Sequence, residues 1–237
     1  MESTMRPIGL STSGECMPVT ISIFSGQRSC TYIQHGILRR FAYHTPTSAC
    51  VIGETGGGVD EYFHLEPTDV DIKMGTLSKG LGTCGGYLAG RECLIEYLRY
   101  NLPGFVFSVG ISPALAAGTL EAIRQLRHNP AIMADLRRNI RCFAECAQKH
   151  GFDICLAGET AILPVLVGKD EDAFALSNEM RRRGVFVPPA VFPAVPKNKA
   201  RLRFCVISEH KPEQIERALD VLEEAAAALN ISLPRQG

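Results

Sequence analysis

One lysine of this chain lies among residues that suit a reactive amine. The segment Asp71–Tyr87 passes from a short strand pattern into a turn crowded with glycines and hydroxyl groups, and Lys79 lies in that turn. Glycines let the backbone approach a ligand closely, hydroxyls at Thr76 and Ser78 can donate to a phosphate, and burial of an ammonium favours its neutral, nucleophilic form. These residues predict a lysine that condenses with an aldehyde. Composition alone fits a solvated lysine in a glycine-rich loop equally well, and the spacing is not that of a P-loop.

The cysteines do not form the pattern of a disulfide framework or of a zinc site. The chain has nine cysteines, an odd number without a CxxC pair, and no apolar secretory segment precedes them. We therefore expect reduced thiols in an intracellular protein. Cys142 and Cys146 have the i,i+4 spacing of one helix face, but no second cysteine pair lies nearby to complete a tetrahedral shell. Packing on that face is favoured over metal binding.

Composition restricts the classes of protein to which the chain can belong. Of its 237 residues, 46% are hydrophobic and 21% are charged, with 25 Lys+Arg against 25 Asp+Glu. This balance excludes a disordered or collagenous chain and gives no polycationic surface for nucleic acid. No run approaches the roughly 18–20 apolar residues of a membrane span. We expect a cytoplasmic protein; the alternative is an organelle-targeted one, because residues 1–47 are rich in Ser and Thr and poor in acids.

The elements that position Lys79 follow from the apolar pattern. Strands and helices alternate from residue 48 onward, which predicts an α/β architecture. Strands are expected at 21–24, 70–76, 105–109, 162–167, 185–187 and 202–207. Helices are expected at 95–100, 113–127, 130–150, 170–183 and 212–229. A small α/β unit should therefore follow the lysine turn.

Four motifs, in order, give the chain a family resemblance. The segment Thr76–Gly82, followed by Gly85–Tyr87, resembles the lysine motif of the α-oxoamine synthases, which are enzymes of fold type I that depend on pyridoxal 5'-phosphate (PLP). Three further segments resemble stretches of the same family, namely Ser48–Gly58, Pro103–Ser108 with Pro113, and Arg201–Phe204 with His210. The resemblance covers about residues 48–229 and implies a partial large domain, with a mainly parallel sheet, and a small C-terminal α/β domain.

The resemblance assigns roles to individual residues. Lys79 would hold PLP covalently, and Thr76 and Ser78 would bind its phosphate. Ser108 would reach the phosphate bound by a partner subunit, because the family's active sites lie at a homodimer interface. Arg203 would pair with the carboxylate of an amino acid through its planar guanidinium. Arg201 shares the face of Arg203 by the period of two, so the choice between the two arginines stays open.

The implied reaction condenses an amino acid with an acyl thioester, carried by coenzyme A or by a carrier protein, and releases CO2. An aminotransferase of the same broad fold is one alternative, because it uses the same lysine. A fragment that dimerises without catalysis is the other. The glycines at 56–58 invite a phosphate-binding interpretation, but an ordinary loop is the favoured one.

Two departures from the family affect these expectations. The acidic residue that pairs with the pyridine nitrogen, and the histidine three positions after it, fall on His44 and Thr47, and neither supplies an anion. The resemblance also lacks the upstream part of the large domain. We therefore divide the chain into a divergent, poorly ordered start (1–47), a partial PLP-binding domain (48–125) and a small domain (126–237).

Overall fold

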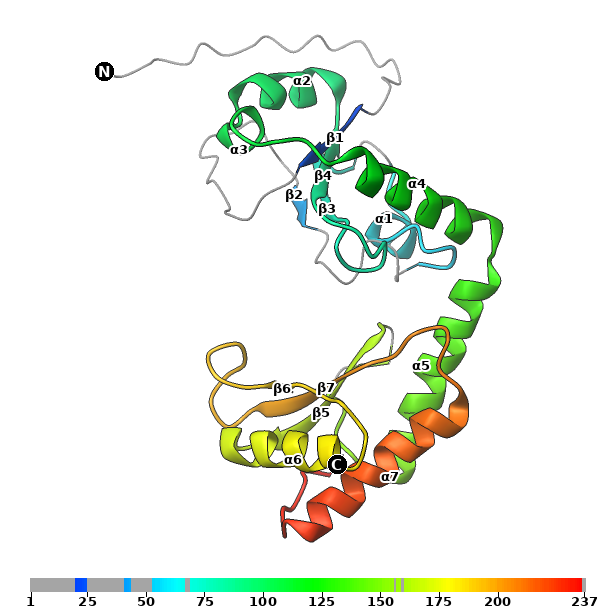
Figure 1. Ribbon diagram of the computed structural model, residues 1–237, viewed down its shortest axis with the longest axis vertical. Coiled ribbons are helices and arrows are strands. Elements are labelled where there is room, and N and C mark those ends of the chain that lie inside the picture. The colour runs from blue at the N-terminus through cyan, green and yellow to red at the C-terminus, as the bar shows by residue number, and fades with distance from the viewer. Residues whose placement is uncertain are drawn as a thin grey trace, which may run out of the picture.

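The computed structural model describes residues 20–24, 41–43, 53–66, 69–155, 157–158 and 160–235. Its elements form two groups connected by one long helix, α5 (Figure 1). The first group contains β1 (Thr20–Phe24), β2 (Phe41–Tyr43), α1 (Val59–Tyr62), β3 (Ile72–Thr76), β4 (Gly86–Gly90), α2 (Glu92–Asn101), α3 (Pro103–Val106) and α4 (Pro113–His128). The second contains α5 (Ala131–Lys149), β5 (Ile162–Gly168), α6 (Asp170–Arg182), β6 (Pro189–Ala190), β7 (Ala200–Cys205) and α7 (Pro212–Ala228).

The first group is built on a four-stranded sheet in the order β1-β4-β3-β2. The β1–β4 and β3–β4 pairs are antiparallel, and only β2–β3 is parallel among these described strands. The α/β class is confirmed, but the expected prevalence of parallel pairs is wrong for this sheet. For the β3–β4 pair the reason is the short connection between the two strands, since a parallel pair needs a crossover of a dozen residues or more.

A close approach between side chain and backbone fixes the β3–β4 hairpin. Gly75 lies opposite Tyr87 in the antiparallel register, and a Cβ at Gly75 would overlap the Tyr87 ring. Glycine at this position lets the ring lie across the strand. Helix α2 covers the sheet through Ile95 and Leu98, which form a small apolar cluster with Ile72.

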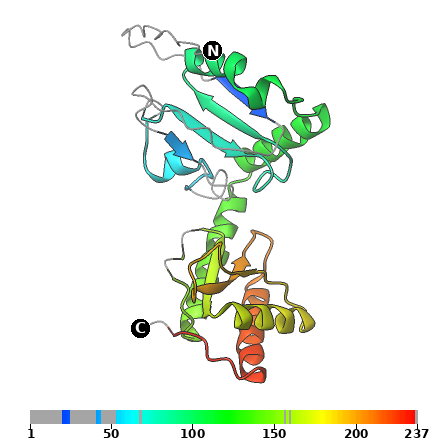
Figure 2. The same cartoon turned by 90° about the vertical axis from the view of Figure 1, so that its left-hand side faces the viewer.

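The second group is a three-stranded antiparallel sheet, β5-β7-β6, with helices packed on one face. In β7 the buried residues are Ala200, Leu202 and Phe204, and they alternate with the less buried Arg201 and Arg203. This period of two places one face against α5, α6 and α7, where most of the protein's buried apolar side chains gather. Figures 1 and 2 show α6 and α7 on the side of this sheet that faces away from the first group.

The apolar pattern predicts the long helices well. Helix α4 begins at Pro113, whose missing N–H costs nothing at the first turn, and the Ser112 hydroxyl accepts the N–H of Leu115 at 3.4 Å. Gly151 follows α5 and Gly184 follows α6, both with positive φ. Among the described residues, no helix combines the length and the hydropathy that crossing a membrane requires.

At two positions where the sequence predicts a strand, the described residues do not form one. Residues 105–109 instead end the short helix α3, and Phe107 and Val109 are 87% and 83% exposed. Pro103 favours a first helical turn there. Residues 185–187 are extended without a ladder, because the Val185 N–H bonds to Met180 and the Val187 carbonyl accepts the Ser177 hydroxyl at 2.6 Å.

Candidate active site

The turn that carries Lys79 is closed by its own backbone. It connects β3 to β4, and the Leu77 N–H donates to the Gly85 carbonyl at 2.9 Å. The Gly82 N–H donates to the Lys79 carbonyl at 2.9 Å, and the Thr83 N–H donates to the Leu77 carbonyl at 3.0 Å. Glycine suits position 82, where φ is +64°. The chain therefore holds Lys79 in a defined turn that directly follows a strand.

The hydroxyls expected beside Lys79 are brought together with it. The Oγ atoms of Thr76 and Ser78 lie 2.9 Å apart, and the Thr76 hydroxyl also lies 3.2 Å from the Gly85 carbonyl. The Ser78 N–H points at the Thr76 hydroxyl at 3.4 Å. Two hydroxyls and a primary amine thus share one turn, which is the donor set that a phosphorylated aldehyde requires.

Exposure of Lys79 departs from the expected burial. The Lys79 side chain is exposed, and within the described part of the chain no hydrogen bond or ion pair engages its ammonium. By contrast, the Lys73 ammonium lies 2.6 Å from a carboxylate oxygen of Asp60. The desolvation expected of a nucleophilic amine is therefore not supplied by the residues described around Lys79.

Ser108 lies in the first group but shares no described contact with the lysine turn. It follows α3, and its hydroxyl donates to the Phe105 carbonyl at 3.2 Å. This bond completes the last turn of a four-residue helix. The placement leaves the role expected for Ser108, on a partner subunit's phosphate, as a prediction.

The two arginines of β7 differ in how they are used. Both lie on the face of β7 opposite the core, in agreement with the period of two. The Arg201 Nε donates to the Lys199 carbonyl at 3.2 Å, whereas the Arg203 guanidinium has no hydrogen-bond or ion-pair partner among the described residues. Its backbone N–H bonds to Pro188 at 3.0 Å. The Arg203 guanidinium therefore keeps all of its N–H donors for a carboxylate ligand, whereas the Nε–H of Arg201 is used within the chain.

The glycine loop at 53–58 binds a carboxylate of the chain itself. Backbone N–H groups of Thr55 and Gly57 each donate to the Glu61 carboxylate at 2.8 Å. Burial raises the pKa of Glu61, but these hydrogen bonds outweigh it and hold the pKa below its usual value. The Arg137 guanidinium donates to the Gly53 carbonyl at 2.6 Å and connects the loop to α5. The ordinary-loop interpretation agrees with this, because Glu61 uses the N–H groups that a phosphate would need.

A buried amide links α5 to the turn after β7. Asn139 is fully buried, and its Nδ2 donates to the carbonyls of Ile207, Ser208 and His210 at 3.0, 3.2 and 2.7 Å. The His210 ring accepts the Ile207 N–H at 3.3 Å, which is a local structural contact. Sequence reasoning did not single out Asn139. The signal was a lone polar residue on the apolar face of a long amphipathic helix.

The cysteine pair of α5 is packed in the helix. Cys146 is buried and Cys142 is partly buried. Burial, together with the neighbouring Cys146, raises the pKa of Cys142 to about 11. A thiol of this kind stays protonated and unreactive at neutral pH. Among the described residues, no group of three or more His, Cys, Asp or Glu side chains is placed to hold a metal ion.

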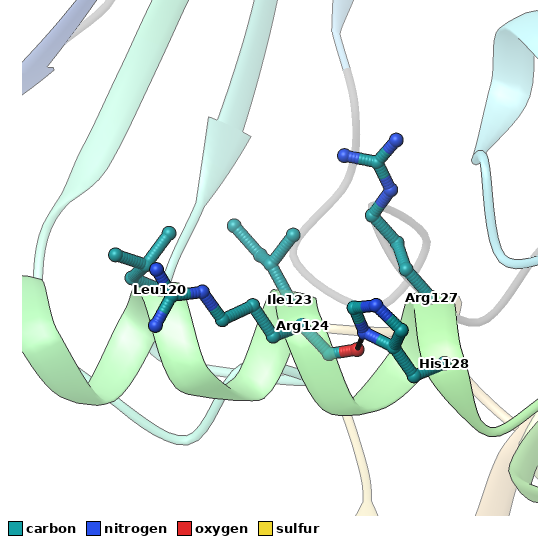
Figure 3. Close-up of a pocket in the computed structure, with 5 residues that line it drawn as sticks. All are labelled: Leu120, Ile123, Arg124, Arg127 and His128. Carbon is teal, nitrogen blue, oxygen red and sulfur yellow. Dashed lines mark hydrogen bonds between the residues drawn. The ribbon is translucent and has the colours of Figure 1, made fainter.

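Two hollows of the described surface are lined by residues outside the lysine turn. One, of about 520 Å³, lies along α4, where Leu120 and Ile123 lie beside Arg124, Arg127 and His128 (Figure 3). The other, of about 710 Å³, lies at the start of α6 and the chain after α7. Neither of these two hollows is lined by Lys79 or Arg203.

The residues of the lysine turn fit one end of PLP. The amine of Lys79 and the hydroxyls of Thr76 and Ser78 match its aldehyde and phosphate, and a Cβ added at Gly82 would meet nothing within 4 Å. The residues expected near the ring nitrogen, His44 and Thr47, lie outside the described residues. The residues of the lysine turn therefore match the aldehyde and the phosphate of PLP.

Fold and site together define the class. A strand that ends in a lysine turn, followed by a separate small α/β unit, is the arrangement of PLP enzymes of fold type I. The chain matches the family model described as aminotransferase class I and II over residues 41–222, and it belongs to that family. The match begins at residue 41, slightly before the resemblance at 48.

Particular relatives narrow the class to the α-oxoamine synthases. Over 181 residues the chain is 40% identical to 8-amino-7-oxononanoate synthase of Thermoanaerobacter pseudethanolicus. The aligned region covers 76% of this chain and 45% of that protein. It is similar to a serine palmitoyltransferase of Sphingomonas wittichii, with a TM-score of 0.73, 31% identity, and coverage of 79% and 47% of the two chains. A serine palmitoyltransferase variant solved with PLP gives a TM-score of 0.73 at 27% identity, over 78% of this chain and 47% of that one. The resemblance is confirmed, and the chain spans about half the length of these relatives.

Proposed function

We propose that this chain carries the lysine turn and the small lobe of a PLP-dependent C-acyltransferase, which condenses an amino acid with an acyl thioester and releases CO2. The observation that carries the proposal is the grouping of Thr76, Ser78 and Lys79 on one turn after β3. The relatives support acyl transfer over amino transfer, because they are named 8-amino-7-oxononanoate synthase and serine palmitoyltransferase.

Each residue of the turn has a distinct task in this proposal. The Lys79 amine binds the aldehyde of PLP, and the hydroxyls of Thr76 and Ser78 donate to its phosphate. When bound, PLP supplies an electron sink for negative charge at the Cα of the amino acid. The Lys79 amine would also be the base that the turn offers for the Cα proton.

Arg203 is the residue proposed for the amino-acid carboxylate. Its guanidinium is free of described partners, whereas Arg201 is engaged by the Lys199 carbonyl. A bidentate pair with the carboxylate would orient the Cα of the substrate toward the cofactor. Substitution of Arg203 by Ala should therefore raise the KM for the amino acid much more than substitution of Arg201 by Ala.

The partners follow from the same proposal. The substrates are an amino acid and an acyl-CoA or an acyl-carrier thioester, and the functional form is a homodimer in the cytoplasm. Ser108 would then contact the phosphate held by the partner subunit. The proposed organisation keeps three parts, with a divergent start at 1–47, a partial PLP-binding domain at 48–125 and a small domain at 126–237.

A specific observation favours one second candidate, a chain that binds PLP without turnover. The Lys79 amine is exposed, and the two positions matched to the family's ring-contacting residues are His44 and Thr47. Without an anion at the ring nitrogen, stabilisation of the carbanion is weakened. This candidate predicts weak cofactor binding and little or no condensation.

An assay of CO2 release separates the two candidates. The purified chain is incubated with PLP, a set of amino acids labelled at the carboxylate, and acyl-CoA thioesters. We expect CO2 release that requires both substrates, is abolished by Lys79→Ala and is retained by Lys169→Ala, since Lys169 is an exposed lysine of the second group. Labelling of Lys79 by PLP without any CO2 release would favour the non-catalytic candidate. An aminotransferase would instead transfer the amino group to an oxo acid and release no CO2.

A further inference from the structure

The lysine turn is connected to α4 by a pair of threonine hydroxyls. Thr119 of α4 is 6% exposed, and its Oγ1 lies 2.8 Å from the Oγ1 of Thr83 in the turn. The Thr83 hydroxyl also lies 3.2 Å from the carbonyl of Leu77. A Cβ added at Gly118 would contact the Thr83 methyl group at 3.6 Å, so α4 packs directly against the turn.

The contacts of the pair outnumber its protons. The Thr119 hydroxyl has the Leu115 carbonyl at 2.8 Å as a second possible acceptor. Since each hydroxyl carries one proton, two protons serve three contacts. In one arrangement Thr119 donates to Thr83, which donates to Leu77. In a second, Thr83 donates to Thr119, which donates to Leu115. A third arrangement, in which both hydroxyls donate to their carbonyls, leaves no proton between the two oxygens and makes their 2.8 Å approach unfavourable. The first two arrangements keep the Thr83–Thr119 bond, which holds the turn on α4.

We propose that Thr119 is a positioning residue for Lys79, which acts through Thr83 to hold the lysine turn in the conformation that presents its amine to the cofactor. This inference rests on the proposed function of Lys79. The path is short, because Leu77 is buried and lies two residues before Lys79, and its carbonyl accepts both the N–H and the hydroxyl of Thr83. A buried hydrogen bond that is lost leaves its remaining partner unsatisfied, so the turn would shift to recover one.

The test compares variants that remove or keep the hydroxyl. Thr119→Val is nearly isosteric and removes it, and Thr119→Ser keeps it. Thr160→Val is the matched control, because the Thr160 hydroxyl makes a similar bond to the Ile162 carbonyl at 3.1 Å, in the second group. Each purified chain is treated with PLP and borohydride, and peptide mapping gives the ratio of label on Lys79 to label on Lys169.

We expect Thr119→Val to lower that ratio by about three- to tenfold, the loss that one net hydrogen bond represents. Thr119→Ser should restore it, and Thr160→Val should leave it unchanged. Thr83→Val should match Thr119→Val, and the double variant should be no worse than either single one. Where the unsubstituted chain labels Lys79 preferentially, a ratio unchanged in Thr119→Val, or lowered equally in Thr119→Ser, would overturn the inference.

Hydrogen exchange of the 77–85 peptide, without PLP, separates this inference from the proposed function. If the unsubstituted chain shows no preference for Lys79, the proposed function fails. Faster exchange of the peptide in Thr119→Val than in Thr160→Val would still uphold the positioning role of Thr119. Equal exchange in the two variants would overturn it. Urea unfolding of each variant shows whether any change is global.

Discussion

Glu61 is a carboxylate whose role is to organise a loop. Its two oxygens accept the N–H groups of Thr55 and Gly57, and a Cβ at Gly53 would overlap the carboxylate. Gly53 and Gly57 are thus explained by close approach to a side chain of α1, and Gly56 and Gly58 by their positive φ, without a phosphate. A glycine-rich stretch alone does not distinguish these cases, because both need bare backbone N–H groups around an anion.

Substitution of Glu61 should loosen this loop. We expect Glu61→Ala to increase hydrogen exchange and proteolytic cleavage within residues 53–58, whereas Glu66→Ala, at an exposed position nearby, should not. The folded-state pKa of Glu61 is lowered, so its stabilisation is complete above the usual glutamate pKa, about 4.3, and is lost as the pH falls through the lower folded value. Exchange of the loop measured between neutral and acidic pH checks this. Equal exchange in the two variants at neutral pH would contradict it.

Cysteine reactivity follows from burial. Cys142 keeps its proton because its pKa is raised to about 11, and Cys146 beside it is buried. We expect iodoacetamide near pH 8 to alkylate the exposed Cys84, Cys93 and Cys205 of the folded chain but to leave the α5 pair unlabelled. Mass spectrometry of the peptides shows which cysteines are alkylated. The same experiment in urea should show that the α5 thiols react once they are exposed. Early labelling of Cys142 in the folded chain would disprove its packing.

At the scale of elements, the second group is held together by helices α5, α6 and α7 on one face of the β5-β7-β6 sheet. Phe143 of α5 is 1% exposed and its ring centroid lies 5.0 Å from that of Phe204 in β7. This contact joins the connecting helix to the strand that carries Arg203. Packing at Phe143 therefore sets the position of the proposed carboxylate-binding strand.

Truncation of this ring should be costly. We expect Phe143→Ala to lower the free energy of unfolding by about 3–5 kcal/mol, as for other buried aromatic residues. Phe174→Ala provides a control, because that ring on α6 is 51% exposed and its loss should cost much less. Urea denaturation followed by circular dichroism measures both. Similar costs for the two variants would show that Phe143 does not hold the core.

The same elements show what the sequence pattern can predict. Helices α4, α5 and α7 have apolar periodicity and clear start or stop residues, such as Pro113, Gly151 and Pro212, and they lie close to where the pattern predicts them. Strand β4 has small residues and no alternation, so its pairing with β3 depends on the turn between them and not on its own pattern. The run after Pro103 is apolar but exposed, which periodicity cannot detect.

Within the candidate site, the sequence predicts which residues lie on the lysine turn, but it does not predict which segments surround that turn. Thr76, Ser78 and Lys79 are neighbours in sequence, so one turn brings them together. Exposure of Lys79 depends on which segments cover the turn, and the contact of Thr83 with Thr119 joins residues that are distant in the sequence. A single sequence holds no direct signal for either property.

At the scale of the whole molecule, the two groups differ in how much apolar core they bury. The cluster in the second group extends from Met133 to Ala226 and includes residues from every helix of that group, whereas the cluster under α2 is small. Because burial of apolar area is the main source of stability, the second group should unfold last. Helix α5 belongs to this core although it also connects the two groups (Figure 2).

The second group should therefore fold alone. We expect a fragment of residues 129–235 to unfold cooperatively in urea, with a midpoint close to that of the last transition of the full chain. A fragment of residues 53–128 should show no cooperative transition. Circular dichroism at a helix wavelength follows both. Loss of cooperativity in the 129–235 fragment would mean that the first group contributes to its stability.

If Lys79 is the cofactor lysine of this chain, the distribution of label over the lysines will show it. The folded chain is incubated with a limiting amount of PLP, reduced with borohydride and digested, and the label on each lysine peptide is quantified. Lys149, Lys169 and Lys211 are exposed internal standards. We expect Lys79 to be labelled well above these three, and we expect inorganic phosphate, which competes for the hydroxyls of Thr76 and Ser78, to lower this preference. Label spread evenly over the exposed lysines would contradict it.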